Sequence, residues 1–262
     1  MSSKTTAEIL RLMQSAEREA AELMLHARHI LAETKTGRRD VVTEYDRRVQ
    51  ELLMRRLKEA LPEAAFFCEE SMQQGDLAAE TLFIIDPIDG TMNFVHGFQR
   101  SCISVAYMSR GTVLAGAVYN PYLDEMFTAE KGGGAYLNGK AIHVTDAPLA
   151  ESLVCCGTTP YSPQLADKGF DMMKKAFLAS LDLRREGAAA LDLCTVAAGR
   201  AGAYFELQVC LWDFAAGALI AQEAGAVCST VTGSPLPYDG SRPTILAGSR
   251  QTAEALLQVF GE

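Results

Sequence analysis

A buried strand that ends in clustered acidic residues is the feature that most constrains how this chain folds. Residues 81–85, Thr-Leu-Phe-Ile-Ile, combine β-branched and large apolar side chains and predict a strand inside the protein. The strand runs into Asp86, Pro87 and Asp89-Gly90, where proline interrupts a central ladder and Asp-Gly favours a tight turn. Carboxylates at the end of a buried strand are unfavourable unless a positive charge lies among them. The stretch therefore predicts either a solvated turn or a cation-binding site at a sheet edge.

A further acidic residue follows another apolar strand and can reach the same sheet edge. Residues 64–68 predict a short strand that ends at Glu69. If the two strands are neighbours, the carboxylates of Glu69, Asp86 and Asp89 meet. Carboxylate and carbonyl oxygens, including the free backbone carbonyl of Ile88, are the ligands that Mg²⁺ prefers. Taken alone, each acid also fits the commoner role of a solvated surface residue.

Asp213 lies between two bulky aromatic residues at the start of an apolar helix predicted at residues 213–224. As a plain N-cap it needs no further function. Its neighbours Trp212 and Phe214 indicate partial burial, and a buried carboxylate requires a charge partner. Asp213 is therefore either a helix cap or the partner of a positive charge.

Thr91 directly follows the Asp-Gly turn, and two roles are open to it. Its position is typical of a helix cap, but a threonine hydroxyl beside a carboxylate can also orient a water molecule. The backbone amides of Gly90 and Thr91, at a helix N-terminus, could hold a phosphate. On sequence alone, Lys35 and Asp46 are predicted to be surface residues.

Two amphipathic helices are predicted in the N-terminal part. Apolar residues at three- and four-residue steps predict a helix over residues 5–33, with a capping box formed by Thr5 and Glu8. An exposed, mobile loop is expected at residues 34–40. A second helix then stops before Pro62.

Residues 101–145 predict a largely antiparallel sheet. Its first strands are expected at residues 102–108, 112–119 and 124–130. Asn138-Gly139, between alternating apolar and polar residues, gives the strongest hairpin signal in the chain.

From about residue 150 the pattern changes to alternating short strands and helices. A helix is expected over residues 163–180, with Phe170, Met173 and Phe177 facing inward. The chain is accordingly divided into two parts that together form one compact unit, an N-terminal α+β part at residues 1–148 and a C-terminal α/β part at residues 149–262.

Charge and cysteine content exclude some classes of function. A formal net charge of −9 and a pI near 5.1 argue against a surface built to bind nucleic acid. The seven cysteines include no CxxC pair, and several lie in apolar runs, which predicts reduced, buried thiols. The N-terminal stretch is charged throughout, and no window is apolar enough to span a bilayer. We expect a cytoplasmic protein.

Four short motifs, in order within about residues 35–235, resemble those of the inositol monophosphatase family. They are Val42-Thr43 with Asp46, Glu69-Glu70-Ser71, Asp86-Pro87-Ile88-Asp89-Gly90-Thr91 followed by Asn93-Phe94, and Trp212-Asp213-Phe214-Ala215-Ala216-Gly217 with Glu223-Ala224-Gly225. Four ordered motifs are far more specific than any one of them and outweigh the surface interpretations of single residues. The resemblance implies an α+β fold, layered as an α/β/α/β/α sandwich, and a Mg²⁺-dependent phosphomonoesterase.

The resemblance also implies a role for each site residue. Glu69, Asp86 and the Ile88 carbonyl would hold one Mg²⁺, Asp86, Asp89 and Asp213 would hold a second, and a third, weaker ion could help to activate water. Glu69 and Thr91 would orient the attacking water. The substrate contacts would come from the amides of Gly90 and Thr91, from Asp213 and from Glu206, which would bind a substrate hydroxyl. Lys35 and Asp46 would support the site from the early loop and helix.

The leading expectation is hydrolysis of inositol monophosphate or a similar polyol phosphate. The enzymatic alternatives are fructose-1,6-bisphosphate, histidinol phosphate and a 3′-phosphonucleotide. A regulatory protein that keeps the fold but acts through a partner is an alternative of another class. Family members are commonly Li⁺-sensitive homodimers, so both properties are expected here. Gln99-Arg100 and Ala188 depart from the family pattern near the expected substrate rim and leave the substrate preference open.

Overall fold

The computed structural model describes residues 4–37, 39–71 and 75–261. The helices in these ranges are α1 (Thr6–Leu25), α2 (Glu44–Ala60), α3 (Thr91–Val95), α4 (Ala166–Ala179), α5 (Ala189–Ala197), α6 (Leu211–Glu223) and α7 (Arg250–Gly261), with short 3-10 helices at Leu149–Glu151 and Pro163–Leu165. The strands before residue 145 are β1 (Ala32–Gly37), β2 (Asp40–Thr43), β3 (Ala65–Cys68), β4 (Thr81–Asp89), β5 (Cys102–Ser109), β6 (Thr112–Asn120), β7 (Glu125–Glu130), β8 (Gly134–Leu137) and β9 (Lys140–Ile142). The later strands are β10 (Leu153–Cys156), β11 (Asp182–Arg184), β12 (Ala203–Glu206), β13 (Val227–Ser229) and β14 (Ile245–Gly248).

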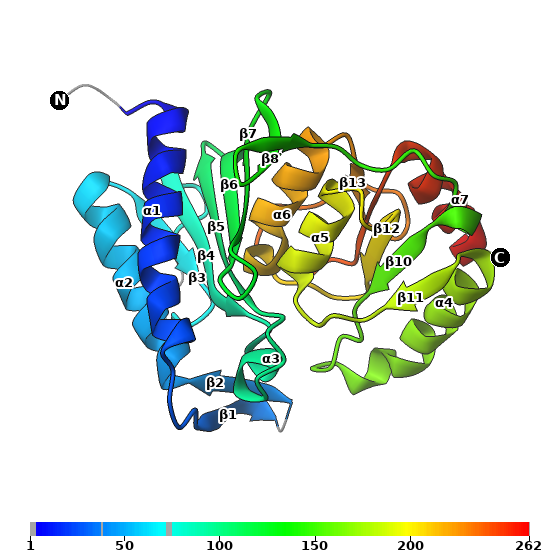
Figure 1. Cartoon of the computed structure of the whole chain (residues 1–262), viewed down its shortest axis with the longest axis horizontal. Coiled ribbons are helices and arrows are strands. Elements are labelled where there is room, and N and C mark those ends of the chain that lie inside the picture. The colour runs from blue at the N-terminus through cyan, green and yellow to red at the C-terminus, as the bar shows by residue number, and fades with distance from the viewer. Residues whose placement is uncertain (1–3, 38, 72–74, 262) are drawn as a thin grey trace.

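These elements form alternating helical and sheet layers (Figure 1). A seven-stranded sheet runs in the order β3-β4-β5-β6-β7-β8-β9, with α1 and α2 on one face and α5 and α6 on the other. A five-stranded sheet, β11-β10-β12-β14-β13, packs against α5 and α6 from the far side and has α4 and α7 on its outer face. The layers confirm the predicted α/β/α/β/α sandwich. The division of the chain near residue 148 stays a prediction.

The register of β3 and β4 brings two acidic strand ends to one edge of the seven-stranded sheet. The strands are parallel, and Cys68 lies opposite Ile85. Glu69 and Asp86, the next residues in each strand direction, therefore lie side by side, and the backbone N–H of Glu69 donates to the carbonyl of Ile85 at 3.1 Å. On its other side β4 pairs antiparallel with β5, and this register shifts between Asp86 and Asp89. The shift lets β4 continue past Pro87, so the strand is longer than its apolar run predicted.

Local signals in the sequence are confirmed where they depend on neighbouring residues. The Thr5–Glu8 capping box begins α1, and α2 ends at Ala60, just before Pro62. The three strands expected between residues 102 and 130 form, and Asn138 and Gly139 both have positive φ, 49° and 75°, as a tight hairpin turn requires.

The first helix is shorter than its apolar pattern predicted, and the expected loop after it is wrong. The helix ends at Leu25, and His29 has a φ of 50°, which an α-helix does not allow. Residues 32–37 then form β1, which pairs antiparallel with β2. The hairpin is held to α2 by Arg47, whose Nη2 lies 2.6 Å from Oε2 of Glu33.

The inward face predicted for the helix at residues 163–180 is partly wrong. Met173 is buried, but Phe170 and Phe177 are 63% and 53% exposed. Met172 and Ala176 are buried instead. Apolar residues occupy two faces of α4, and the face that packs on the five-stranded sheet is the one without the two phenylalanines.

None of the seven cysteines forms a disulfide bond in the described residues, as expected. Cys68, Cys102, Cys155, Cys156 and Cys194 are buried. Within the described ranges, none of the helices combines the length and the hydropathy needed to cross a membrane.

Candidate active site

Four carboxylates face one another between the two sheets. Glu69 follows β3, Asp86 and Asp89 belong to the end of β4, and Asp213 lies in the first turn of α6. Burial raises the pKa of Asp86 well above its ordinary value, and the charges of Glu69, Asp89 and Asp213 raise it further. Burial likewise raises the pKa of Asp89 to about 7. The structure therefore brings together the four acids that the sequence pointed to, in a setting where their negative charges oppose one another.

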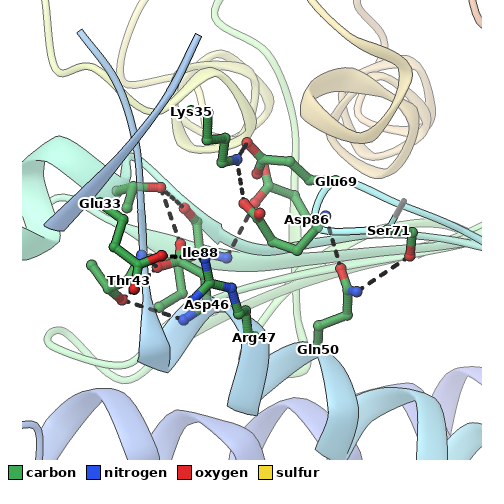
Figure 2. A network of polar contacts seen from close by, with 12 residues as sticks. Glu33, Lys35, Thr43, Asp46, Arg47, Gln50, Glu69, Ser71, Asp86 and Ile88 are labelled. Carbon is green, nitrogen blue, oxygen red and sulfur yellow. Dashed lines mark hydrogen bonds and ion pairs between the residues drawn. The ribbon is translucent and has the colours of Figure 1, made fainter. Parts of the chain in front are cut away.

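A lysine supplies the positive charge nearest to these acids. Lys35 is on β1, and its Nζ donates to Oε1 of Glu69 at 2.9 Å and also to Oε1 of Glu70. Burial alone would lower the pKa of Lys35, but the carboxylates of Glu69 and Glu70 outweigh it and raise the pKa. Figure 2 shows the side chains of Lys35, Glu69 and Asp86 pointing toward one another. The expectation of a surface lysine is wrong, because the β1–β2 hairpin carries Lys35 over the sheet edge.

The donor set fits a hard divalent cation. Within the part of the chain that the structure describes, no three His, Cys, Asp or Glu side chains already converge at metal-ligand distances. The charges of Glu69 and Asp86 instead repel each other, and the positive charge that contacts Glu69 is Nζ of Lys35, 2.9 Å from its Oε1. The donors are carboxylates and a backbone carbonyl, which are the ligands that Mg²⁺ prefers. Buried, mutually repelling acids favour such an ion because its charge relieves the repulsion.

Asp89 has a structural contact as well as its place among the acids. Its Oδ2 accepts a hydrogen bond from the backbone N–H of Ala190 at 2.7 Å. Ala188, the N-cap of α5, has no side-chain oxygen to cap the helix, and the carboxylate of Asp89 provides that cap from the other sheet. The alanine at position 188 therefore leaves Asp89 as the acceptor at this helix end.

Asp213 is not the N-cap of α6, so that interpretation is wrong. Cys210 occupies the N-cap, and Asp213 is the third helical residue. Its Oδ2 accepts from the backbone N–H of Cys210 at 2.6 Å, which fixes the carboxylate toward the other acids. Burial, followed by the charge of Asp89, raises the pKa of Asp213 well above its ordinary value.

A buried hydroxyl–carboxylate pair adjoins the acids. Oγ1 of Thr91 lies 3.2 Å from Oδ1 of Asp46 and 3.0 Å from the carbonyl oxygen of Ile88. The other oxygen of Asp46 accepts from the backbone N–H and the hydroxyl of Thr43, at 2.8 and 2.5 Å. Asp46 is fully buried rather than a surface residue. Thr91 is the first residue of α3 and not its cap, since Gly90 occupies that position.

Gly90 makes the turn that places Thr91. Its φ and ψ are 82° and 41°, a left-handed conformation that glycine adopts without strain. A β-carbon at this position would also lie 2.9 Å from the carbonyl oxygen of Arg100. Side-chain nitrogen Nδ2 of Asn93 donates to that same carbonyl at 2.6 Å and to the carbonyl of Glu186 at 2.7 Å. The turn is thus fastened to the segment that precedes α5.

Glu206 reaches the site from the five-stranded sheet. It ends β12, and its oxygens accept from the Tyr204 hydroxyl and the backbone N–H of Thr159, each at 2.8 Å. Burial raises the pKa of Glu206. Its negative charge in turn helps to raise the pKa of Asp89 and Asp213, which places it within electrostatic reach of both.

Sequence reasoning missed two residues at this rim, Thr159 and Arg185. The backbone of Thr159 orients Glu206, and Arg185 donates from Nη2 to Oγ1 of Thr158 at 3.0 Å. The pair Arg184-Arg185 before Gly187 was a usable signal, because a cation beside a left-handed glycine is a common feature of anion sites. No comparable signal marks Thr159. Of the residues that depart from the family pattern, Gln99 is exposed with a φ of 55°, and Nε of Arg100 pairs with Glu186 at 3.1 Å.

The raised carboxyl pKa values predict how metal-free protein responds to pH. Because the pKa of Asp89 is about 7 in the folded state and near 3.8 ordinarily, the folded protein retains a proton that the unfolded chain loses. Stability is therefore lost as the pH rises through about 7. Melting temperature in the presence of a chelator should be lower at about pH 8 than at about pH 6.

Magnesium should reverse that trend, since the ion replaces the protons. Millimolar Mg²⁺ is expected to raise the melting temperature more at the higher pH. An equal Mg²⁺ effect at both pH values would contradict a site made of these acids. Other buried acids change the melting temperature with pH but do not bind Mg²⁺. The part of the pH effect that Mg²⁺ removes therefore reports on the four acids of the site.

Comparison with known proteins places this geometry in context. A model described as the Inositol monophosphatase family matches residues 5–262. A protein of Neisseria meningitidis serogroup B named putative Nus factor SuhB is 39% identical over 83% of this chain and 85% of its own length. An inositol-1-monophosphatase of Mesorhizobium japonicum is 34% identical over 85% of this chain and 83% of its own length.

Solved structures share the fold over nearly the whole chain. The extragenic suppressor protein SuhB of Bartonella henselae has a TM-score of 0.91 at 30% identity, covering 97% of this chain and 99% of that one. An IMPase/NADP phosphatase complexed with NADP and Ca²⁺ has a TM-score of 0.86 at 26% identity, covering 98% and 97%. A staphylococcal inositol monophosphatase in a LiCl-soaked inhibitory complex has a TM-score of 0.85 at 26% identity, covering 98% and 96%.

Proposed function

Because the chain belongs to the inositol monophosphatase family, we propose that it is a Mg²⁺-dependent phosphoric monoester hydrolase whose substrate is inositol monophosphate or a related small phosphate ester. The observation that carries the proposal is the convergence of Glu69, Asp86, Asp89 and Asp213 from three separate elements at one sheet edge. A purely structural role would not gather four carboxylates in a buried space.

The metal ligands would divide among these acids. Glu69, Asp86 and the Ile88 carbonyl would hold one ion, and Asp86, Asp89 and Asp213 a second, with a third, weaker position open. When bound, Mg²⁺ would supply Lewis-acid stabilisation of the phosphoryl oxygens and a lowered pKa of a bound water. Lys35 neutralises Glu69 and Glu70 on the hairpin side and so limits the repulsion within the site.

Thr91 and Glu69 would orient the attacking water. The Thr91 hydroxyl carries one proton and has two acceptors in reach, Asp46 and the Ile88 carbonyl. Since that proton is committed to an acceptor, the lone pairs of Oγ1 are free to accept a hydrogen bond from water. Asp46 is in turn held by hydrogen bonds from the backbone N–H and the hydroxyl of Thr43.

The substrate would be held from both sheets. The backbone amides of Gly90 and Thr91 would donate to the phosphate, while Glu206 and Asp213 would accept hydrogen bonds from hydroxyl groups of the alcohol part. Glu206 already accepts three hydrogen bonds from the protein, two at Oε1 and one at Oε2, so Oε2 has a lone pair left for a ligand.

Removing the Thr91 hydroxyl tests the water-orienting role. Thr91→Val keeps the side-chain shape but is expected to lower kcat by about 10²–10⁴-fold, because positioned proton acceptors contribute on this scale. Thr91→Ser keeps the hydroxyl and should retain most of the activity. Steady-state kinetics with Mg²⁺ would measure both variants. Equal losses in Thr91→Ser and Thr91→Val would point to packing rather than to the hydroxyl.

A screen of phosphate esters tests the function itself. Purified protein with Mg²⁺ is expected to release phosphate from inositol 1-phosphate, and kcat/KM values would rank fructose-1,6-bisphosphate, histidinol phosphate and a 3′-phosphonucleotide against it. Li⁺ is expected to inhibit the reaction. Absence of phosphate release from the whole panel would rule out the proposal.

A role through a macromolecular partner is the second candidate. Relatives named Nus factor SuhB support it, as do exposed apolar side chains on the outer face of α4, Phe170 and Phe177 among them. The intact acid set favours catalysis and does not exclude a second role. A variant without turnover that keeps its cellular role would support the partner function.

Two further properties are proposed from the family alone. We expect a homodimer, which sedimentation or size-exclusion chromatography would test, and a cytoplasmic location, which fractionation would test. A monomer at micromolar concentration would contradict the first of these.

A further inference from the structure

One cation at the rim of the acidic site has no role in the proposed chemistry. Arg185 follows β11, and its guanidinium folds back over Gly187, where an added β-carbon would lie 2.5 Å from Nη1. The same β-carbon would lie 3.3 Å from Nδ2 of Asn93. The carbonyl oxygen of Gly187 is packed against Gly90, 3.2 Å from where a β-carbon would stand there. The guanidinium thus lies beside the turn proposed to hold phosphate.

Arg185 differs from the arginines around it in lacking an acidic partner. The neighbouring arginines each form an ion pair, Arg100 with Glu186, Arg184 with Asp182, and Arg200 with Glu125. Within residues 4–37, 39–71 and 75–261, the hydrogen-bond acceptor found for Arg185 is the neutral hydroxyl of Thr158, and no carboxylate lies at ion-pair distance. A guanidinium has five N–H donors, so most of those on Arg185 are left for a ligand.

The charge of Arg185 is directed toward the side of the site where Glu206 lies. Burial raises the pKa of Glu206, and the positive charge of Arg185 is among the effects that lower it. Thr158, which contacts Arg185, adjoins Thr159, whose N–H binds Glu206. Arg185 and Glu206 therefore flank the same space, the space in which the alcohol part of a bound ester would lie.

We propose that Arg185 binds a second phosphate group, carried by the alcohol part of the substrate, and so selects bisphosphorylated compounds over simple monoesters. The proposal rests on the function proposed above. An arginine fork matches phosphate oxygens with two parallel hydrogen bonds, and an arginine without an acidic partner can offset the repulsion between the acids of the site and a second phosphate. Glu206 would bind a hydroxyl next to that phosphate.

The test compares matched pairs of esters. One pair is adenosine 3′,5′-bisphosphate and 3′-AMP, and a second is inositol 1,4-bisphosphate and inositol 1-phosphate. The wild-type protein should show at least about tenfold higher kcat/KM for the bisphosphate of the preferred skeleton. Arg185→Gln should remove that preference through KM, with kcat and the monoester kcat/KM changed by less than about threefold. Arg184→Gln, whose arginine is paired with Asp182, serves as the matched control and should keep the preference.

Several outcomes would overturn the proposal. The first is that the wild-type protein shows no preference for the bisphosphate. The second is that Arg185→Gln lowers activity equally on both members of a pair, which is the result expected if Arg185 has only a structural role. Titration calorimetry of adenosine 3′,5′-bisphosphate with Ca²⁺ in place of Mg²⁺ adds a readout without turnover. Binding at least about tenfold weaker in Arg185→Gln supports the proposal, and equal binding overturns it, even if neither ester is hydrolysed and the proposed function fails.

Discussion

Asp89→Asn is expected to lower kcat/KM for phosphate release by at least about 10³-fold, because it removes a charged ligand from the position where charge is stabilised in the reaction. The substitution is nearly isosteric. The remaining Oδ1 can still accept the hydrogen bond from Ala190 that caps α5, so the fold is expected to persist. Asp89→Ala would remove that cap as well and confuse the two effects.

Stability measurements separate loss of the metal site from loss of the fold. The pKa of Asp89 is raised to about 7, so above that pH its ionised form is unfavourable in the metal-free protein. Asp89→Asn should therefore melt at the same or a higher temperature than the wild type in chelator. Mg²⁺ should raise the melting temperature of Asp89→Asn less than that of the wild type, because the variant lacks one metal ligand.

Kinetics and partner assays then decide between the two candidate functions. Asp171→Asn, which changes an exposed acid paired with Lys175 on α4, is a suitable control and should keep its activity. Turnover of Asp89→Asn within about threefold of the wild type would contradict the assignment of Asp89 as a ligand. A role through a partner alone would survive the substitution unchanged.

Glu17→Met is expected to stabilise the protein by about 1–3 kcal/mol, because it removes a buried carboxyl that lacks hydrogen-bond partners. Glu17 lies on α1, is fully buried, and neither of its carboxyl oxygens has a partner among the described residues. The adjacent Arg18 is directed elsewhere, with Nη1 2.7 Å from Asp124 and 3.1 Å from the Tyr119 hydroxyl. Methionine has similar length and helix propensity and suits the apolar surroundings.

The stabilisation should depend on pH in a stated direction. Burial raises the pKa of Glu17 well above its ordinary value, so the unfavourable charge is imposed on the folded state as the pH rises through that folded pKa. The gain from Glu17→Met should consequently grow with rising pH and shrink in acid. Chemical denaturation at several pH values would measure it.

A surface acid on the same helix provides the control for this substitution. The side chain of Glu22 is 63% exposed, and Glu22→Met should leave stability almost unchanged. Phosphatase activity should also be unaffected by Glu17→Met, since α1 covers the face of the seven-stranded sheet opposite α6. A destabilised Glu17→Met protein, or a gain that does not vary with pH, would contradict this account.

Much of the site could be predicted from sequence because its acids stand at the ends of recognisable elements. Apolar runs predicted β3 and the first half of β4, and the acids that follow each run were assigned to a sheet edge. That Glu69 and Asp86 lie side by side depends on a parallel register that neither strand specifies alone. Asp213 was interpreted as either a helix cap or the partner of a positive charge, and its place at the third position of α6 was not predicted.

The features that sequence reasoning missed or misjudged share a cause. The local surroundings of Lys35 and Asp46 indicated surface residues, and only the family resemblance implied that they support the site. Lys35 is part-buried against Glu69, and Asp46 is fully buried beside Thr91. Phe170 and Phe177 have helical spacing that suits burial, yet the packing of α4 leaves them exposed. Spacing along a helix identifies its faces, but only the neighbouring layer determines which face is covered.

The sequence by itself determined most of the local elements, the hairpin turn, the capping box of α1 and the set of acids available for a metal site, since these depend on residues within a few positions of one another. The tertiary structure alone decided that the acids after β3 and β4 meet Asp213, that Glu206 faces them from the second sheet, and that Arg185 lies at the rim without an acidic partner. Burial and electrostatic repulsion arise between segments distant in sequence, so the raised carboxyl pKa values that make the strand end after Ile85 a candidate metal site exist only in the folded chain.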